Sequence, residues 1–173
     1  MARRVLDILR SETGFSLIEM LIALVITGCI SVGITAGITQ MVSIGSMNSN
    51  SILATKSIQN TVYWFRIDAK MAQMIDLDSG DSGLPVTLGW VEWDSSEHSV
   101  SYAVDGNRLT RSYSVDGSDP STMLVTAFVE PDSDMTNCQF TGGVLTYKVS
   151  VTVGEGRSAV TMTDTINIDP RSD

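Results

Sequence analysis

Apolar residues are concentrated in one long run near the N-terminus. Between Phe15 and Thr39 the only ionisable side chains are Glu19 and Cys29, and most other positions are Leu, Ile, Val, Met, Ala or Gly. About 20 apolar residues form a helix of about 30 Å, which matches the hydrocarbon core of a bilayer. The pattern therefore predicts a membrane-spanning helix.

A mostly polar segment, residues 43–51, follows this run and contains no proline. Apolar residues then recur at steps of four, three, four and three, as on one face of an amphipathic helix: Ile58, Val62, Phe65, Ala69 and Ala72. Arg66, Asp68 and Lys70 fall on the other faces. We expect a nearly continuous helix from Phe15 to Leu77, weakest between Gly45 and Asn50, whose second half packs on a sheet.

After Pro85 the apolar residues alternate with polar ones, as in strands with one buried face. Asp105-Gly106-Asn107 predicts a hairpin turn between two such runs, and Gly154-Glu155-Gly156 separates two later ones. Residues 131–143 are expected to form a long loop. The chain thus predicts an α+β fold, in which a long N-terminal helix, membrane-spanning in its first half and amphipathic in its second, packs on a C-terminal antiparallel β-sheet.

Acidic residues outnumber basic ones in this chain. Lys and Arg number 11 against 20 Asp and Glu, a net charge of -9, which argues against nucleic-acid binding because phosphate contacts need clustered cations. Arg3, Arg4 and Arg10 precede the apolar run, so the positive-inside rule places the N-terminus in the cytoplasm and the rest of the chain outside it. The alternative is a secretory signal peptide that is removed whole, but the run is longer than the usual apolar region of such a peptide.

Glu19 is the feature of the apolar run that most needs an explanation. A carboxylate in a membrane helix is costly unless it is paired, and no Lys or Arg lies within one helical turn. If the chain were cut between Gly14 and Phe15, the new amino group of Phe15 would lie one turn from Glu19, or would pair with Glu19 of a neighbouring subunit. The alternative is an interfacial glutamate that extends to the lipid headgroups.

Residues 14–28, Gly-Phe-Ser-Leu-Ile-Glu-Met-Leu-Ile-Ala-Leu-Val-Ile-Thr-Gly, closely resemble the prepilin cleavage and methylation motif of type IV pilins and type II secretion pseudopilins. By this resemblance Gly14 precedes the scissile bond, Phe15 becomes the N-methylated terminus, and Glu19 is the acidic residue that pairs subunits during assembly. The chain departs from many major pilins in two ways: it has no proline before Pro85, and its only cysteines are Cys29 and Cys138. Cys138 is expected to be a buried free thiol or to pair between molecules, and no structural disulfide is expected.

The resemblance also implies a domain organisation and partners. Residues 1–14 would be a cytoplasmic leader peptide that is removed, 15–47 the transmembrane and filament-core helix, 48–77 the amphipathic half of the helix, and 78–173 an exported sheet domain. The implied partners are a prepilin peptidase, sister pilins or pseudopilins, the inner-membrane assembly platform and the membrane itself, with no direct contact to nucleic acid. The protein would be a single-pass inner-membrane protein before it enters a pilus or pseudopilus.

Catalytic and metal-binding patterns are weak. His98 is the only histidine and lies beside Glu97 in an expected hairpin turn, where an exposed side chain is the expectation. The chain has no Gly-x-Ser-x-Gly, Cys-x-x-Cys, His-Glu-x-x-His or Walker sequence, so we expect neither an enzyme nor a cofactor. Two acidic groups offer oxygen ligands to calcium, as in some similar pseudopilins, but neither has the spacing of a full coordination loop: Asp76, Asp78 and Asp81, and Asp132 and Asp134.

Two classes of function stay open. The favoured one is a structural subunit, minor or initiating, of a type IV pilus, a competence pilus or a type II secretion pseudopilus. Residues 66–69 and 102–111 are similar to minor pseudopilins and minor pilins of the J or W type, which favours the minor role. The alternative is a filament-borne binding or adhesive module that contacts a surface, a secreted substrate or DNA, with Trp90 and Trp93 either in an exposed patch or in the core.

Overall fold

The computed structural model describes residues 15–77 and 82–171, and the chain divides into two compact units, Met1–Ile44 and Gly45–Asp173. Helix α2 spans Leu17–Met71, a length of 55 residues. It is helical through residues 45–50, so the weak point expected there does not interrupt it. Its N-terminal part contains an 18-residue window that is long and apolar enough to cross a membrane, and none of that window is buried within the chain.

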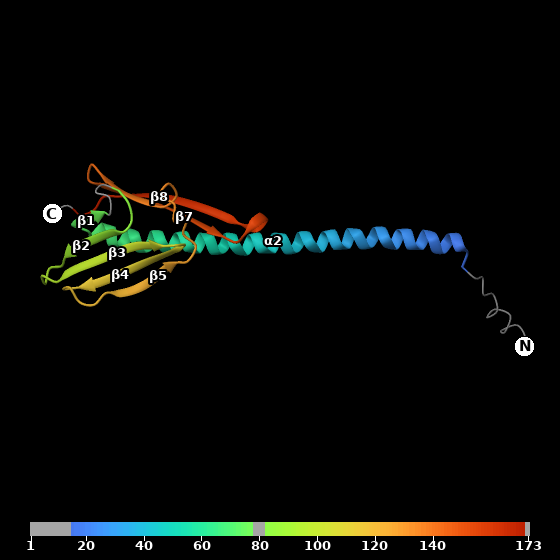
Figure 1. Cartoon of the computed structure of the whole chain (residues 1–173), viewed down its shortest axis with the longest axis horizontal. Coiled ribbons are helices and arrows are strands. Elements are labelled where there is room, and N and C mark those ends of the chain that lie inside the picture. The colour runs from blue at the N-terminus through green and yellow to red at the C-terminus, as the bar shows by residue number, and fades with distance from the viewer. Residues whose placement is uncertain (1–14, 78–81, 172–173) are drawn as a thin grey trace, which may run out of the picture. The chain divides into compact units, whose positions relative to one another are not determined.

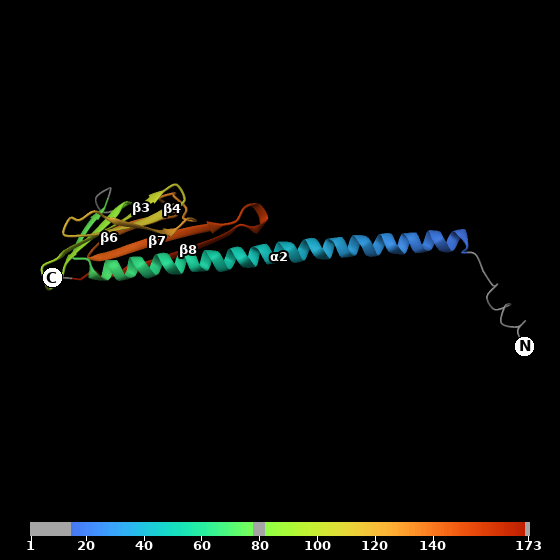
Figure 2. The same cartoon turned by 90° about the horizontal axis from the view of Figure 1, so that it is seen from below.

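The second unit contains two antiparallel sheets. The five-stranded sheet has the order β1-β2-β3-β4-β5, and the three-stranded sheet has the order β6-β7-β8. The strands are β1 (Met74–Leu77), β2 (Val86–Val91), β3 (Glu97–Asp105), β4 (Arg108–Val115), β5 (Ser121–Thr126), β6 (Asn137–Thr141), β7 (Val144–Val153) and β8 (Val160–Ile168), and a 3-10 helix, η2 (Gly156–Ser158), joins the last two. Both sheets lie along the C-terminal half of α2 (Figures 1 and 2).

The predicted amphipathic face of the helix is confirmed. Ile58, Phe65, Ala69 and Ala72 are buried, and Val62 packs against the same core in a partly buried position. Phe65 joins both sheets to the helix, because its ring lies 3.9 Å from the ring of Tyr147 on β7 and 5.1 Å from that of Tyr102 on β3. Aromatic rings at these separations add to the stabilisation from apolar burial.

The α+β class and both predicted hairpins are confirmed. Asp105 pairs with Arg108 across the turn between β3 and β4, where Gly106 has a φ of +57°. β7 pairs with β8 in register from Leu145 opposite Ile168 to Val153 opposite Val160. The strands form two sheets, whereas the alternation predicted one, because alternation identifies strands without saying which strands pair.

Two predicted boundaries are wrong. The helix ends at Met71, not at Leu77, because the backbone N–H of Gln73 donates to the carbonyl of Gly89 at 2.8 Å and residues 74–77 pair with β2. The segment 131–143, expected as a loop, contains β6, which pairs with β7. In both cases pairing with the next strand along the chain satisfies the backbone polar groups. The domain boundaries after residues 14 and 47 stay predictions.

Candidate functional site

The N-terminal motif lies where α2 begins. Phe15 is exposed and precedes the helix, and Glu19 lies in its first turn, where the backbone N–H of Glu19 donates to the carbonyl of Ser16 at 2.9 Å. A carboxylate in this position interacts favourably with the positive end of the helix dipole. No ion pair of Glu19 occurs within residues 15–77 and 82–171. Gly14 lies outside the described residues, so the roles of Gly14, Phe15 and Glu19 stay predictions.

Hydroxyl side chains in the apolar part of α2 are satisfied within the helix. Thr27, Ser31, Thr35 and Thr39 each donate to the carbonyl four residues earlier, at 2.6–2.8 Å. Polar groups without partners are costly in hydrocarbon, and these bonds remove that cost. The segment is therefore suited to a bilayer or an apolar filament core in spite of its four hydroxyl groups.

A buried ion pair connects α2 to the five-stranded sheet. The carboxylate of Asp68 is reached by Arg111 on β4, with Nε 2.7 Å from Oδ2 and Nη2 2.8 Å from Oδ1. The hydroxyl of Tyr102 on β3, the residue directly opposite Arg111, also donates to Oδ2. Asp68 is only 3% exposed. The sequence placed Asp68 on a polar face of the helix, and this was wrong because its cation comes from a strand 43 residues away.

The surroundings of Arg111 favour its charged form. The hydrogen bond from Arg111 to Asp68 raises the pKa of the guanidinium above its ordinary value, and burial followed by the Asp68 charge raises the pKa of Tyr102. The guanidinium carbon also lies 5.1 Å from the ring centre of Trp64 and 5.3 Å from that of Tyr113. One anion and two aromatic rings therefore hold the cation, and the arrangement fastens α2 to β3 and β4. The opposed Tyr102 and Arg111 of the predicted hairpin were the signal that sequence reasoning left unused.

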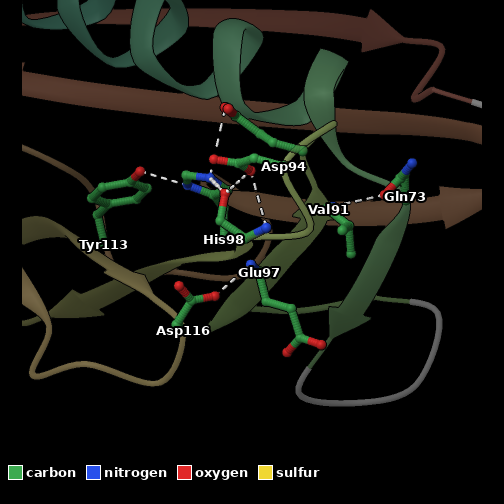
Figure 3. Close-up of polar contacts among 9 residues, drawn as sticks. Gln73, Val91, Asp94, Glu97, His98, Tyr113 and Asp116 are labelled. Atoms are coloured by element: carbon green, nitrogen blue, oxygen red, sulfur yellow. Dashed lines mark hydrogen bonds and ion pairs between the residues drawn. The ribbon is translucent and has the colours of Figure 1, made fainter.

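His98 is not the exposed turn residue that the sequence suggested. It lies on β3, its side chain is 11% exposed, and its ring stacks on Trp90 with the centres 5.2 Å apart. Figure 3 shows the ring between Tyr113 and the turn that carries Asp94. Nδ1 lies 2.6 Å from the Tyr113 hydroxyl, and Nε2 lies 3.1 Å from Ser96 Oγ.

Hydrogen bonds occupy both ring nitrogens of His98. The Ser96 hydroxyl donates to Asp94 at 2.6 Å, so it accepts from Nε2–H of His98. Nδ1 shares its hydrogen bond with the Tyr113 hydroxyl on β4. His98 therefore connects the turn between β2 and β3 to β4.

The calcium candidates are not assembled by the described structure. Asp76 lies on β1 opposite Thr87, whereas Asp78 and Asp81 lie outside the described residues. Asp132 accepts the backbone N–H of Asp134 at 2.9 Å. Among residues 15–77 and 82–171, no group of three or more His, Cys, Asp or Glu side chains is placed to hold a metal ion.

The two cysteines are free thiols in different surroundings. Cys29 is exposed on the N-terminal part of α2, and Cys138 is buried on β6. Burial raises the pKa of Cys138 to about 12. Of the two expectations for Cys138, the structure supports the buried free thiol, because a neutral, inaccessible thiol is unreactive at physiological pH.

Comparison with known proteins bears on the N-terminal motif. Residues 9–35 match the family described as the prokaryotic N-terminal methylation motif. No curated protein and no solved structure matches the chain. The matched segment contains Phe15 and Glu19 and runs into the long apolar helix. These findings support a type IV pilin-like or pseudopilin-like protein.

Proposed function

We propose that the protein is a minor or initiating subunit of a type IV pilus, a competence pilus or a type II secretion pseudopilus. It is processed after Gly14 and assembles through α2. The observation that carries this proposal is the methylation motif at residues 9–35, which continues without a break into an apolar helix with Glu19 in its first turn.

The proposal includes a topology and a set of partners. Arg3, Arg4 and Arg10 keep the N-terminus in the cytoplasm, and α2 crosses the inner membrane once, so the sheets are outside the cytoplasm. A prepilin peptidase removes residues 1–14, and an inner-membrane assembly platform transfers the mature chain to sister subunits. The internally satisfied hydroxyls of Thr27 to Thr39 suit both the bilayer and the filament core.

Glu19 has the central role in assembly. The amino group of Phe15 enters an apolar core as the helices pack together, and it pairs there with Glu19 of a neighbouring subunit. Removing one partner of a buried ion pair costs about 3–5 kcal/mol, because the other charge is left without compensation. The pair therefore sets the register between neighbouring helices.

Mass spectrometry of the membrane fraction tests the processing step. We expect a mature chain that begins at Phe15 and carries one additional methyl group. A chain that begins at Met1, or one cut beyond Thr39, would contradict the proposal, since the first lacks processing and the second lacks the helix.

Substitution of Glu19 tests the assembly step. Glu19→Ala should leave membrane insertion and cleavage largely intact, because insertion depends on apolar length. Co-purification with sister subunits should fall about tenfold or more, since an unpaired Phe15 amine must enter the core. Glu19→Gln should give an intermediate result. Thr27→Ala is the matched control, because the Thr27 hydroxyl donates to the carbonyl of Ala23 in its own helix. If Glu19→Ala co-purifies as well as this control, the pairing role is wrong.

A further inference from the structure

Trp93 is a large apolar side chain that the fold leaves in solvent. It is 94% exposed, whereas Trp90, three residues earlier, is 8% exposed. Trp93 belongs to the turn between β2 and β3, which Figure 3 shows beside His98. Exposed tryptophans are enriched at the energetic centres of protein interfaces, because one rigid ring buries a large area on contact.

The turn that carries Trp93 is held in one conformation. The backbone N–H of Glu92 donates to the carbonyl of Ser96 at 3.0 Å, and that of Ser95 donates to the carbonyl of Glu92 at 3.0 Å. Asp94 accepts from both the backbone N–H and the hydroxyl of Ser96, at 3.0 and 2.6 Å. His98 also contacts the turn, since its Nε2 lies 3.1 Å from Ser96 Oγ. A residue presented on a fixed turn loses little conformational entropy when a partner binds it.

Apolar surface continues from the turn onto the sheet. Trp93 lines a groove with Met71, Val91 and Arg171, and Val91 also borders a second groove on the outer face of β1–β3, beside Met74. Met74 is 73% exposed and Val91 is 43% exposed. The N–H of Val91 donates to the Gln73 side chain at 2.8 Å, which ties this end of β2 to the segment after α2 (Figure 3). We define the Trp93 surface as Met71, Met74, Val91, Glu92 and Trp93.

The residues that line the two grooves carry three carboxylates, those of Asp76, Glu92 and Glu97, against the guanidinium of Arg171. Asp76 and Glu97 line the groove that Met74 borders, and Asp116 accepts the backbone N–H of Glu97 at 2.8 Å. Glu92 lies 3.6 Å from Nε2 of His98. Within the described part of the chain none of these carboxylates forms an ion pair with Lys or Arg. Hydrogen bonds from Ser96 lower the pKa of nearby Asp94 and so keep it ionised.

The sign of this charge selects the kind of partner. The carboxylates around the Trp93 surface repel anionic lipid headgroups and nucleic-acid phosphates, and the chain as a whole has a net charge of -9. Lys and Arg side chains are attracted to it, and a cation over the face of a tryptophan gains a further electrostatic interaction.

We propose that the Trp93 surface docks a segment of a partner protein that combines Lys or Arg with an apolar side chain. The cation lies over the exposed face of Trp93, and the apolar side chain enters the groove beside Val91. This binding goes beyond filament assembly through α2, since it uses only residues of the second unit and does not depend on Glu19.

Site-specific photo-crosslinking of the full-length protein in its membranes tests the proposal. A photoreactive amino acid replaces Met74, which leaves Trp93 in place, and mass spectrometry identifies the crosslinked peptide. We expect a protein segment rich in Lys or Arg. The yield should fall about fivefold or more in Trp93→Ser and less in Trp93→Tyr, because tyrosine keeps part of the cation–π interaction.

A charge-reversal variant and a position control complete the experiment. Glu97→Lys should lower the yield about threefold while leaving the backbone contacts in place, because Glu97 bonds to Asp116 through its backbone N–H and its carbonyl. A photoreactive residue at Leu124, which is 44% exposed on β5, should not capture the same segment. The proposal would be overturned if Met74 gave no adduct, or an adduct to lipid, nucleic acid or an acidic segment. It would also be overturned by the same adduct from Leu124, or by an unchanged yield in Trp93→Ser or Glu97→Lys. Processing and Glu19 pairing are measured in separate experiments. A failure of the Trp93 proposal can therefore be told apart from a failure of the proposed filament function.

Discussion

Removing the Asp68 carboxylate should destabilise the second unit more than any exposed substitution. Asp68→Ala leaves the guanidinium of Arg111 without its anion and the hydroxyl of Tyr102 without its acceptor. Both groups lie beneath α2, where the Arg111 side chain is 14% exposed and Tyr102 is fully buried. Water therefore cannot fully replace the lost carboxylate.

The size of the effect follows from these contacts. Breaking a buried ion pair from one side typically costs about 3–5 kcal/mol. With a urea dependence of about 1–3 kcal/mol per M, the midpoint of unfolding should fall by about 2 M. Replacing both partners by apolar residues, Asp68→Leu with Arg111→Met, should cost less than the sum of the two single changes, because neither charge is then left buried alone.

Urea unfolding of the full-length protein in nonionic detergent provides the measurement. Tryptophan fluorescence reports on it directly, since the Arg111 guanidinium lies 5.1 Å from the ring centre of Trp64. Asp119→Ala is the matched control, because Asp119 is exposed, and its cost should stay within about 0.5 kcal/mol. A loss below about 1 kcal/mol for Asp68→Ala, or strict additivity in the double variant, would refute the reasoning.

Two further predictions concern Gly154 and Cys138. Gly154→Ala should lower the free energy of unfolding more than the control Gly143→Ala, since the new Cβ at Gly154 would lie 2.2 Å from Asn50 Nδ2. The control should cost about 1–2 kcal/mol, because φ is +84° at Gly143 and nothing lies within 4 Å of the added Cβ. Equal losses in urea unfolding would show that the Asn50 contact is irrelevant. The free energy of unfolding should fall as pH rises from about 9 towards 12, because the folded chain keeps the Cys138 proton that the unfolded chain releases. Cys138→Ala should make this slope shallower by up to about 1.4 kcal/mol per pH unit, and an unchanged slope would contradict the assignment.

The sequence alone determined the features that depend on local pattern. The apolar run after Phe15 indicated a membrane-length helix, and the steps from Ile58 to Ala72 identified the face that packs on the sheets. Alternation and turn residues located the β3–β4 and β7–β8 hairpins. The N-terminal motif was equally accessible, because its residues are contiguous and its physical requirement, a partner for Glu19, arises within one helical turn.

Contacts between distant segments were decided only by the tertiary structure. Helical periodicity extended the helix towards Leu77, but pairing with β2 ends it at Met71. Helical periodicity placed Asp68 outside the apolar face, but Arg111, 43 residues later, compensates its charge and allows burial. The burial of His98 and the exposure of Trp93 were likewise decided by tertiary contacts. Stacking on Trp90 buries the histidine, whereas the hydrogen-bonded turn holds Trp93 outside the core. Local spacing specifies which face of an element is apolar, but the partner that covers a polar residue comes from elsewhere in the chain.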